Sequence, residues 1–145
     1  MNIYDIYAFD LINAVAEKLK SAKSIQAPKE SIFWKTAWSK EFPPDDSENF
    51  WYIRAASLLR KLYRKPVGIS RLKKVYGGRS PGYVHLKHSS KGSGAIIRRV
   101  LQQLEKAGYV RTTEKNGREL TNAGRSILDK TAAEIQKTES KEKKE

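Results

Sequence analysis

Two amphipathic stretches restrict the fold of this chain more than any other feature of its sequence. Residues 49–65 and residues 92–110 both carry apolar side chains at the three- and four-residue spacing that places them on one face of a helix. In the second stretch, Ser93 can cap the helix and Gly108 suits the position just after its end. The two apolar faces consist of Trp51, Ala55, Leu58, Leu59 and Leu62 in the first helix and of Ile97, Val100, Leu101 and Leu104 in the second.

Weaker signals fill the interval between these helices. Residues 68–78 predict a short helix, for which Ser70 is a suitable N-cap and the glycine pair 77–78 a suitable end. Pro, Gly and Ser are interspersed among the basic residues of the segment 79–92. This composition predicts an irregular basic loop.

A hairpin and a last helix follow the second long helix. The pair Asn116-Gly117 lies between two short segments within residues 109–121, and Asn-Gly is a strong hairpin signal because both residues tolerate positive φ. Thr121 can cap the last helix, whose apolar pattern ends near residue 135. Helix, short helix, helix, hairpin and helix is the order of a winged helix, the variant of helix-turn-helix that carries a short β-hairpin wing. We therefore predict a mostly α fold with a winged-helix core at residues 49–135.

The remaining residues predict an added layer and a tail. Residues 1–48 are expected to form an N-terminal helical layer, with a helix at 5–22 followed by an aromatic loop. The layer and the core would make one domain, residues 1–135, and the charged segment 136–145 would be a flexible tail because it has no apolar anchor. Most of the clustered aromatic residues are expected to anchor the layer to the core rather than to stack on unpaired bases; they are Trp34, Trp38, Phe42, Phe50, Trp51 and Tyr52.

The charge of the chain indicates a polyanionic partner. Among 145 residues there are 29 Lys and Arg but only 16 Asp and Glu, a net charge of +13. Nucleic acid is the first expectation for such a partner, and an anionic membrane surface is the second. Basic residues that neutralise phosphates release counterions, so several together bind strongly but in a salt-sensitive way. The candidate RNA-binding residues are Arg54, Arg60, Lys61, Arg64, Lys73, Lys74, Arg79, Lys87, Lys91, Arg98 and Arg99.

Signals for catalysis or for a metal are weak. The chain has no cysteine, which excludes disulfides, cysteine-based zinc sites and a cysteine nucleophile. His85 and His88 are the only histidines, and no carboxylate lies near them in the sequence to complete a metal site. Asp45 and Asp46 precede a predicted helix and are better explained as capping residues than as a catalytic pair. We predict no enzyme activity, no cofactor and no metal.

Membrane and secretion signals are missing from the sequence as well. The segment 1–20 contains acidic residues and has no basic region ahead of an apolar block, so it does not resemble a secretory signal. No run of 18 apolar residues exists that could span a bilayer. A soluble intracellular protein without a membrane partner is expected.

Several motifs resemble one known family, the small-subunit ribosomal protein nineteen of the archaeal and eukaryotic type. The resemblance covers roughly residues 5–135, and the pattern WYxRAASxLRxLY followed by YGGR is its most specific part. In two places the chain departs from the family, at Lys65, where the family has glycine, and at Ser89, where an aromatic residue is common. The motifs are KTAWSKEFPP (35–44), WYIRAASLLRKLY (51–63), PVGISRLKKVYGGR (66–79), SGAIIRRVLQQLEKAGYV (93–110) and GRELTNAGRSILDK (117–130).

The resemblance implies a fold and a function. The fold would be a helical bundle around a winged helix, and the protein would lie in the head of the small ribosomal subunit in contact with ribosomal RNA. Eukaryotic members are also needed for maturation of the precursor RNA. The basic face of the family includes the residues that correspond here to Arg54, Arg60, Arg98 and Arg99.

We therefore expect a non-catalytic structural component of the small ribosomal subunit. Its partners would be ribosomal RNA and neighbouring ribosomal proteins, and it would be cytoplasmic, and monomeric when off the ribosome. The alternative is a DNA-binding winged-helix regulator that reads base edges with Arg98, Arg99, Gln102 and Gln103. Such regulators dimerise, and the last helix predicted by the sequence is too short to form a dimer interface.

Overall fold

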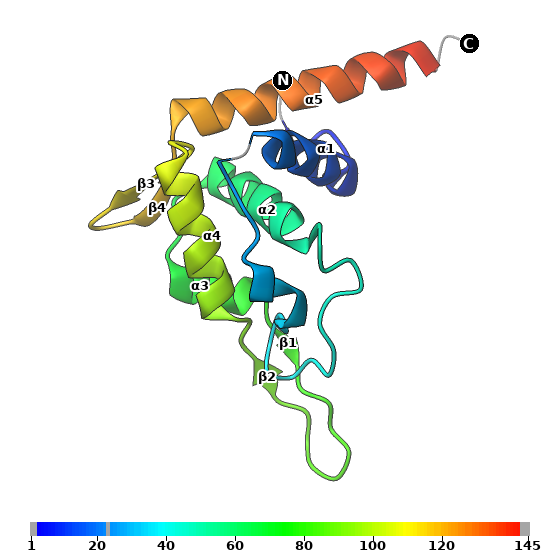
Figure 1. Ribbon diagram of the computed structural model, residues 1–145, viewed down its shortest axis with the longest axis vertical. Helices are drawn as coiled ribbons and strands as arrows, with labels where there is room; N and C mark the ends of the chain where they lie inside the picture. Colours follow the sequence, from blue (N-terminus) through cyan, green and yellow to red (C-terminus); the bar gives the residue numbers. More distant parts are fainter. Residues whose placement is uncertain (1–2, 23, 143–145) are drawn as a thin grey trace.

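The computed structural model describes residues 3–22 and 24–142, and the chain is mostly helical, as predicted (Figure 1). Two small antiparallel hairpins, β1–β2 and β3–β4, complete the secondary structure of the described residues. The elements are α1 (Ala8–Ser21), the 3₁₀ helix η1 (Lys29–Phe33), α2 (Phe50–Arg64), α3 (Ile69–Val75), β1 (Gly78–Arg79), β2 (Ser89–Ser90), α4 (Gly94–Lys106), β3 (Val110–Thr113), β4 (Gly117–Leu120) and α5 (Asn122–Glu142).

Helix α2 is the centre of the core. It packs against α1, α4, α5 and strand β4. The apolar faces that the sequence predicted for α2 and α4 are buried throughout, and each such side chain contributes about 1.5–3 kcal/mol when fully buried. The N-caps predicted at Ser93 and Thr121 are present, and Gly108 ends α4 at a φ of 78°.

The order α2, α3, α4, β3–β4, α5 is the order expected of a winged helix. The hairpin was predicted correctly, although its turn is formed by residues 114–116, and Gly117 is the first residue of β4. Backbone hydrogen bonds of 3.0 and 3.1 Å join Val67 to Arg118, so the connection before α3 is tied to the hairpin. Gly117 has a φ of 86°, and a Cβ there would lie 2.9 Å from the Cα of Gly68. Glycine is therefore required at this position.

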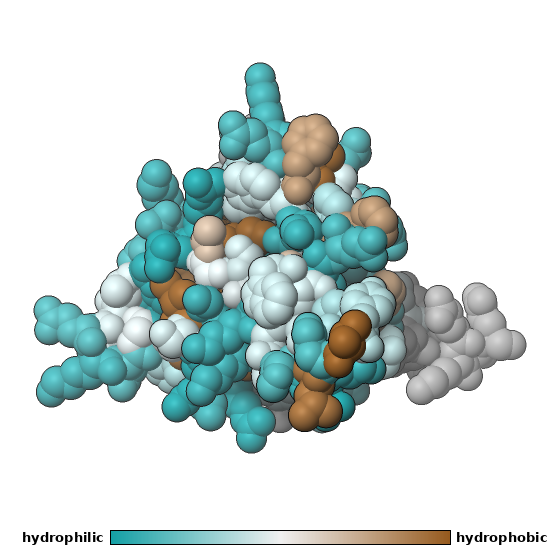
Figure 2. Space-filling model, turned by 90° about the horizontal axis from the view of Figure 1, so that it is seen from below, coloured by the Kyte–Doolittle hydropathy of each residue, from teal (hydrophilic) through white to brown (hydrophobic). Residues whose placement is uncertain are grey.

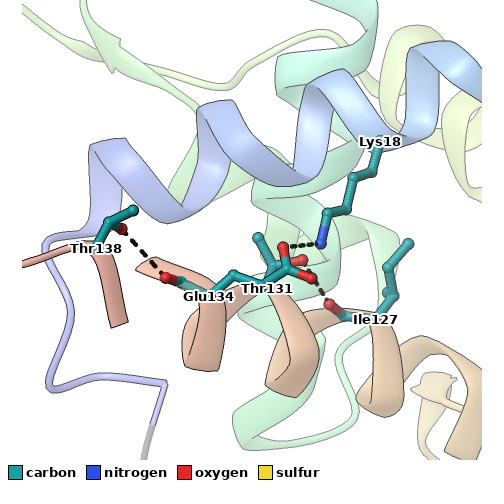
Figure 3. A network of polar contacts seen from close by, with 5 residues as sticks. All are labelled: Lys18, Ile127, Thr131, Glu134 and Thr138. Atoms are coloured by element: carbon teal, nitrogen blue, oxygen red, sulfur yellow. Dashed lines mark hydrogen bonds and ion pairs between the residues drawn. The ribbon is translucent and has the colours of Figure 1, made fainter. Parts of the chain in front are cut away.

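Helices α1 and α5 form a layer over α2. Lys18 of α1 and Glu134 of α5 make an ion pair of 2.5 Å, and Thr131 donates a hydrogen bond to the carbonyl oxygen of Ile127 within α5 (Figure 3). Helix α5 lies at one end of the molecule, and the β1–β2 hairpin extends from the opposite end (Figure 1).

Helix α5 continues past residue 135, where the sequence pattern placed its end. Residues 136–142 are polar, but they are mostly good helix formers, and extending an existing helix costs little. The last helix is therefore the longest in the described part of the chain, and the premise that it is short was wrong. The flexible tail at 136–145 stays a prediction, and residues 143–145 lie outside the described residues.

Two local predictions between α2 and α4 were wrong. Gly68, not Ser70, is the N-cap of α3, and Ser70 lies within the helix. The segment 79–92 is not wholly a loop, since β1 and β2 pair at its base and the amide of Ser80 donates a 2.8 Å hydrogen bond to the carbonyl oxygen of His88. Two-residue strands carry too few alternating side chains to be detected from the sequence.

Candidate nucleic-acid interface

The predicted basic residues are available for an external partner. Most of them are exposed, and within the described residues none takes part in the ion pairs, which are Lys18–Glu134, Arg111–Glu119 and Arg118–Glu105. The acidic residues of these ion pairs are bound to other cations. Among the described residues, no acidic side chain forms an ion pair with a predicted RNA-binding residue. Seen from the end that carries the β1–β2 hairpin, the surface is largely hydrophilic, with separate hydrophobic patches (Figure 2).

One group of cations lines a groove between the end of α2 and α3, which we call the α2–α3 groove. It holds about 420 Å³, and Val67 and Leu72 are buried in its wall. No carboxylate belongs to the lining formed by the described residues. Its five cations are Arg60, Lys61 and Arg64, which the sequence analysis named as candidates, and Lys65 and Arg71, which it did not.

Arg60 has an unusual environment in this groove. Its guanidinium carbon lies 5.0 Å from the centre of the Tyr4 ring, and the Tyr4 hydroxyl donates a 3.3 Å hydrogen bond to the carbonyl oxygen of Arg60. The Nε atom of Arg60 is buried and has no hydrogen-bond partner among the described residues. A buried N–H group without an acceptor is costly, so this position of the Arg60 side chain is less favourable than a hydrogen-bonded one.

Arg54 is also on α2, but other side chains surround it than surround Arg60. Its guanidinium carbon lies 4.1 Å from the centre of the Tyr76 ring and 5.0 Å from that of Phe50. Burial lowers the pKa of Arg54 and raises that of Tyr76, whose hydroxyl is 2.7 Å from the Ser57 hydroxyl. Arg54 therefore has a packing role, and its contact with RNA stays a prediction.

A second group of cations meets aromatic residues beside the N-terminal half of α4. Lys73, Lys91 and Arg99 line a pocket of about 760 Å³ together with Trp34 and Trp38. The Arg99 guanidinium carbon lies 4.7 Å from the centre of the Trp34 ring. We call this site the aromatic pocket. The remaining candidates, Lys74, Arg79, Lys87 and Arg98, are exposed and line neither the groove nor this pocket.

The aromatic cluster is only partly a set of core anchors. Trp51 is fully buried, and Trp34, Phe50 and Tyr52 pack against the core, as predicted for most of the cluster. Trp38 and Phe42 are instead 71% and 73% exposed, so these two residues are not among the core anchors. Both belong to the proline-flanked connection before α2, where too few apolar neighbours are in reach to bury them.

The N-terminal segment covers part of the helix that occupies the recognition position of a winged helix. The amide of Gln103 accepts a 2.8 Å hydrogen bond from Trp51 Nε1 and donates one of 2.9 Å to the carbonyl oxygen of Gln26. Both polar atoms of the Gln103 side chain are therefore hydrogen-bonded within the protein. The Arg99 guanidinium stacks on Trp34. One of the four side chains that were candidates for reading DNA bases, Gln103, is therefore engaged within the protein.

The described residues contain no group of three or more metal-ligating side chains, and His85 and His88 are exposed. None of the helices in this part of the chain is both long enough and apolar enough to cross a membrane.

The chain is similar to known ribosomal proteins over almost its whole length. Residues 2–138 match the family of ribosomal protein S19e. The small ribosomal subunit protein eS19 of Haloarcula marismortui is 45% identical over 138 residues, which are 92% of this chain and 90% of the relative. The corresponding protein of Aeropyrum pernix is 44% identical, covering 93% of this chain and 90% of the relative. For eS19A of Saccharomyces cerevisiae the identity is 41%, and the coverage is 92% and 94%. These matches give no support to the DNA-binding alternative, and the chain belongs to the ribosomal protein S19e family.

Proposed function

We propose that this protein is a structural component of the small ribosomal subunit and that it binds ribosomal RNA. Its relatives in archaea and yeast are named as proteins of that subunit. As a ribosomal protein it is not an enzyme, and its place is on the ribosome in the cytoplasm. Neighbouring ribosomal proteins are its other partners, and off the ribosome it is a monomer.

The α2–α3 groove is the observation that carries this proposal. Its five cations are spread over the end of α2, the following turn and α3, without a carboxylate among the described residues of the lining. Arginine can bind two phosphate oxygens at once, and lysine binds one as a point charge. A folded RNA backbone offers phosphates in a fixed geometry, so a rigid set of cations recognises RNA by shape rather than by sequence.

The charge of the α2–α3 groove favours an oxygen-rich ligand. Five cations line the groove, and no carboxylate of the described residues does. A phosphate oxygen accepts a hydrogen bond and is attracted by the same charges.

Because a protein that binds only folded RNA shifts the RNA towards its folded state, we also propose that the protein assists assembly of the subunit or maturation of its precursor RNA.

A charge-reversal experiment tests the proposal. The double change Arg64→Glu and Arg71→Glu alters two exposed residues of the groove, so the fold should persist. We expect at least about ten-fold weaker binding to small-subunit RNA and less protein sedimenting with small subunits from cells that produce this variant. The matched control is Lys130→Glu, which reverses the charge of an exposed residue of α5. Unchanged RNA affinity and sedimentation of the double variant, with native helix content, would refute the proposed RNA-binding surface.

A further inference from the structure

The aromatic pocket has features that the α2–α3 groove does not have. Beside its cations it presents two large aromatic side chains to solvent, Phe33 at 79% and Trp38 at 71% exposure. Leaving such side chains in water forgoes about 1.5–3 kcal/mol of burial each. A flat apolar surface that is exposed next to positive charge is the chemistry that binds unpaired nucleotides.

The backbone holds the pocket in place before any ligand binds. Ala37 and Gly92 form an antiparallel bridge, and the amide of Ser93 donates a 2.7 Å hydrogen bond to the carbonyl oxygen of Thr36. The amide of Gly92 donates one of 2.8 Å to the carbonyl oxygen of Lys73. The segment after η1, the end of α3 and the start of α4 are thus joined around one cavity, so the backbone that forms it is in place without a ligand.

The cations of the pocket are positioned as well. Arg99 stacks on Trp34, and a Cβ at Gly94 would lie 3.0 Å from Cδ of Lys73, so the stem of this lysine packs directly on the start of α4. Lys35 and Lys91 complete a set of four cations against one acid, Glu30, in the lining formed by the described residues. This balance favours a polyanion over a peptide of mixed charge.

We propose that the aromatic pocket binds a single unpaired base of RNA, stacked on Trp38, with its flanking phosphates on Lys73, Lys91 and Arg99. This inference rests on the proposed RNA binding and adds a second contact of a different kind. The cavity of about 760 Å³ lies in the range of small-molecule sites and has room for one base together with its sugar. A paired base cannot enter it without leaving its helix, so the pocket selects bulged or looped nucleotides.

The test compares two RNA hairpins that differ by one bulged adenosine. The full-length protein should bind the bulged hairpin about ten-fold more tightly than the fully paired one, since stacking of one base on an aromatic side chain has an effect of this order. Trp38→Ala should remove the preference while leaving the affinity for the paired hairpin unchanged, and Trp38→Phe should keep part of it. The matched control is Phe42→Ala, because Phe42 is 73% exposed and does not line the pocket.

The possible outcomes separate this inference from the proposed function. Equal binding of both hairpins by the natural chain, or loss of the preference in Phe42→Ala as well as in Trp38→Ala, overturns the base-binding pocket but not RNA binding. If Trp38→Ala keeps the preference and yet sediments less with small subunits, the pocket holds a neighbouring protein, and the inference is again overturned. If neither hairpin binds at low salt, the proposed RNA binding itself fails.

Discussion

At the scale of single residues, two arginines of one helix illustrate why a basic residue in a motif need not be a ligand-binding residue. Arg54 stacks against Phe50 and Tyr76, and its pKa is lowered by burial. Arg60, six positions later, lines a groove of cations and has an Nε without an acceptor in the described protein. The difference comes from what packs beside each residue, since Phe50 and Tyr76 meet Arg54, whereas Arg60 meets Tyr4 in the wall of the groove.

Removing Arg54 should therefore reduce stability. We expect Arg54→Ala to lower the free energy of unfolding by about 1–2 kcal/mol, because the variant no longer has the partly desolvated cation–π interaction or the packing of the aliphatic stem. Arg64→Ala, an exposed position on the same helix, should change it by less than about 0.5 kcal/mol. Urea unfolding followed by circular dichroism measures both, and equal effects of the two changes would contradict a packing role for Arg54.

At the scale of elements, the hairpin β1–β2 depends on one glycine. A Cβ at Gly77 would lie 2.2 Å from the carbonyl oxygen of Ser90 and 3.1 Å from the Cα of Lys91. At the neighbouring Gly78, none of the described residues lies within 4 Å of the corresponding Cβ position. The glycine pair was predicted to end a helix. Its first residue, Gly77, is needed because two backbone segments approach each other closely there.

Gly77→Ala should consequently loosen the hairpin, at a cost of about 1–3 kcal/mol, because backbone must move to admit the methyl group. Trypsin then gains access to Arg79, Lys87 and Lys91, and cleavage under native conditions should be faster than in the natural chain. Gly78→Ala is the control with the same chemical change and open space. Identical cleavage rates for the two variants would show that the close approach at Gly77 does not hold the hairpin.

The elements also show which parts of the molecule a sequence can reveal. Helices α2 and α4 were predicted well because each has its own periodic apolar face, to which α4 adds a local cap at Ser93. Neither Lys65 nor Trp38 could be placed correctly in this way. Lys65 belongs to the groove because residues of α3, among them Arg71, line the same cavity as the end of α2, and Trp38 follows a residue that is bridged to Gly92. Such contacts join residues distant in sequence, and no local pattern encodes them.

At the scale of the whole molecule, the proposed RNA binding assigns two roles to the charges: the net charge of +13 supplies affinity, and the arrangement of the charges supplies placement. The α2–α3 groove offers cations and one partly exposed ring, Tyr4, over which Arg60 lies, whereas the aromatic pocket presents two more exposed rings, Phe33 and Trp38, beside its cations. An RNA that engages the groove and the pocket is fixed at two points. Its affinity then contains a salt-dependent part from phosphates and a part from base stacking that depends much less on salt.

The salt dependence of binding should separate these two parts. For the bulged hairpin, Arg64→Ala with Arg71→Ala should lower the steepness of log K against log salt by roughly two, one for each phosphate that the variant no longer neutralises. Trp38→Ala should weaken binding and leave the slope unchanged, because an indole releases no counterions. Lys130→Ala, on α5, should alter neither quantity. Titrations at several salt concentrations provide the measurement. A reduced slope in Trp38→Ala would mean that the pocket acts by organising its lysines on phosphate rather than by stacking a base, and an unchanged slope in the double variant would remove the groove from the RNA-binding surface.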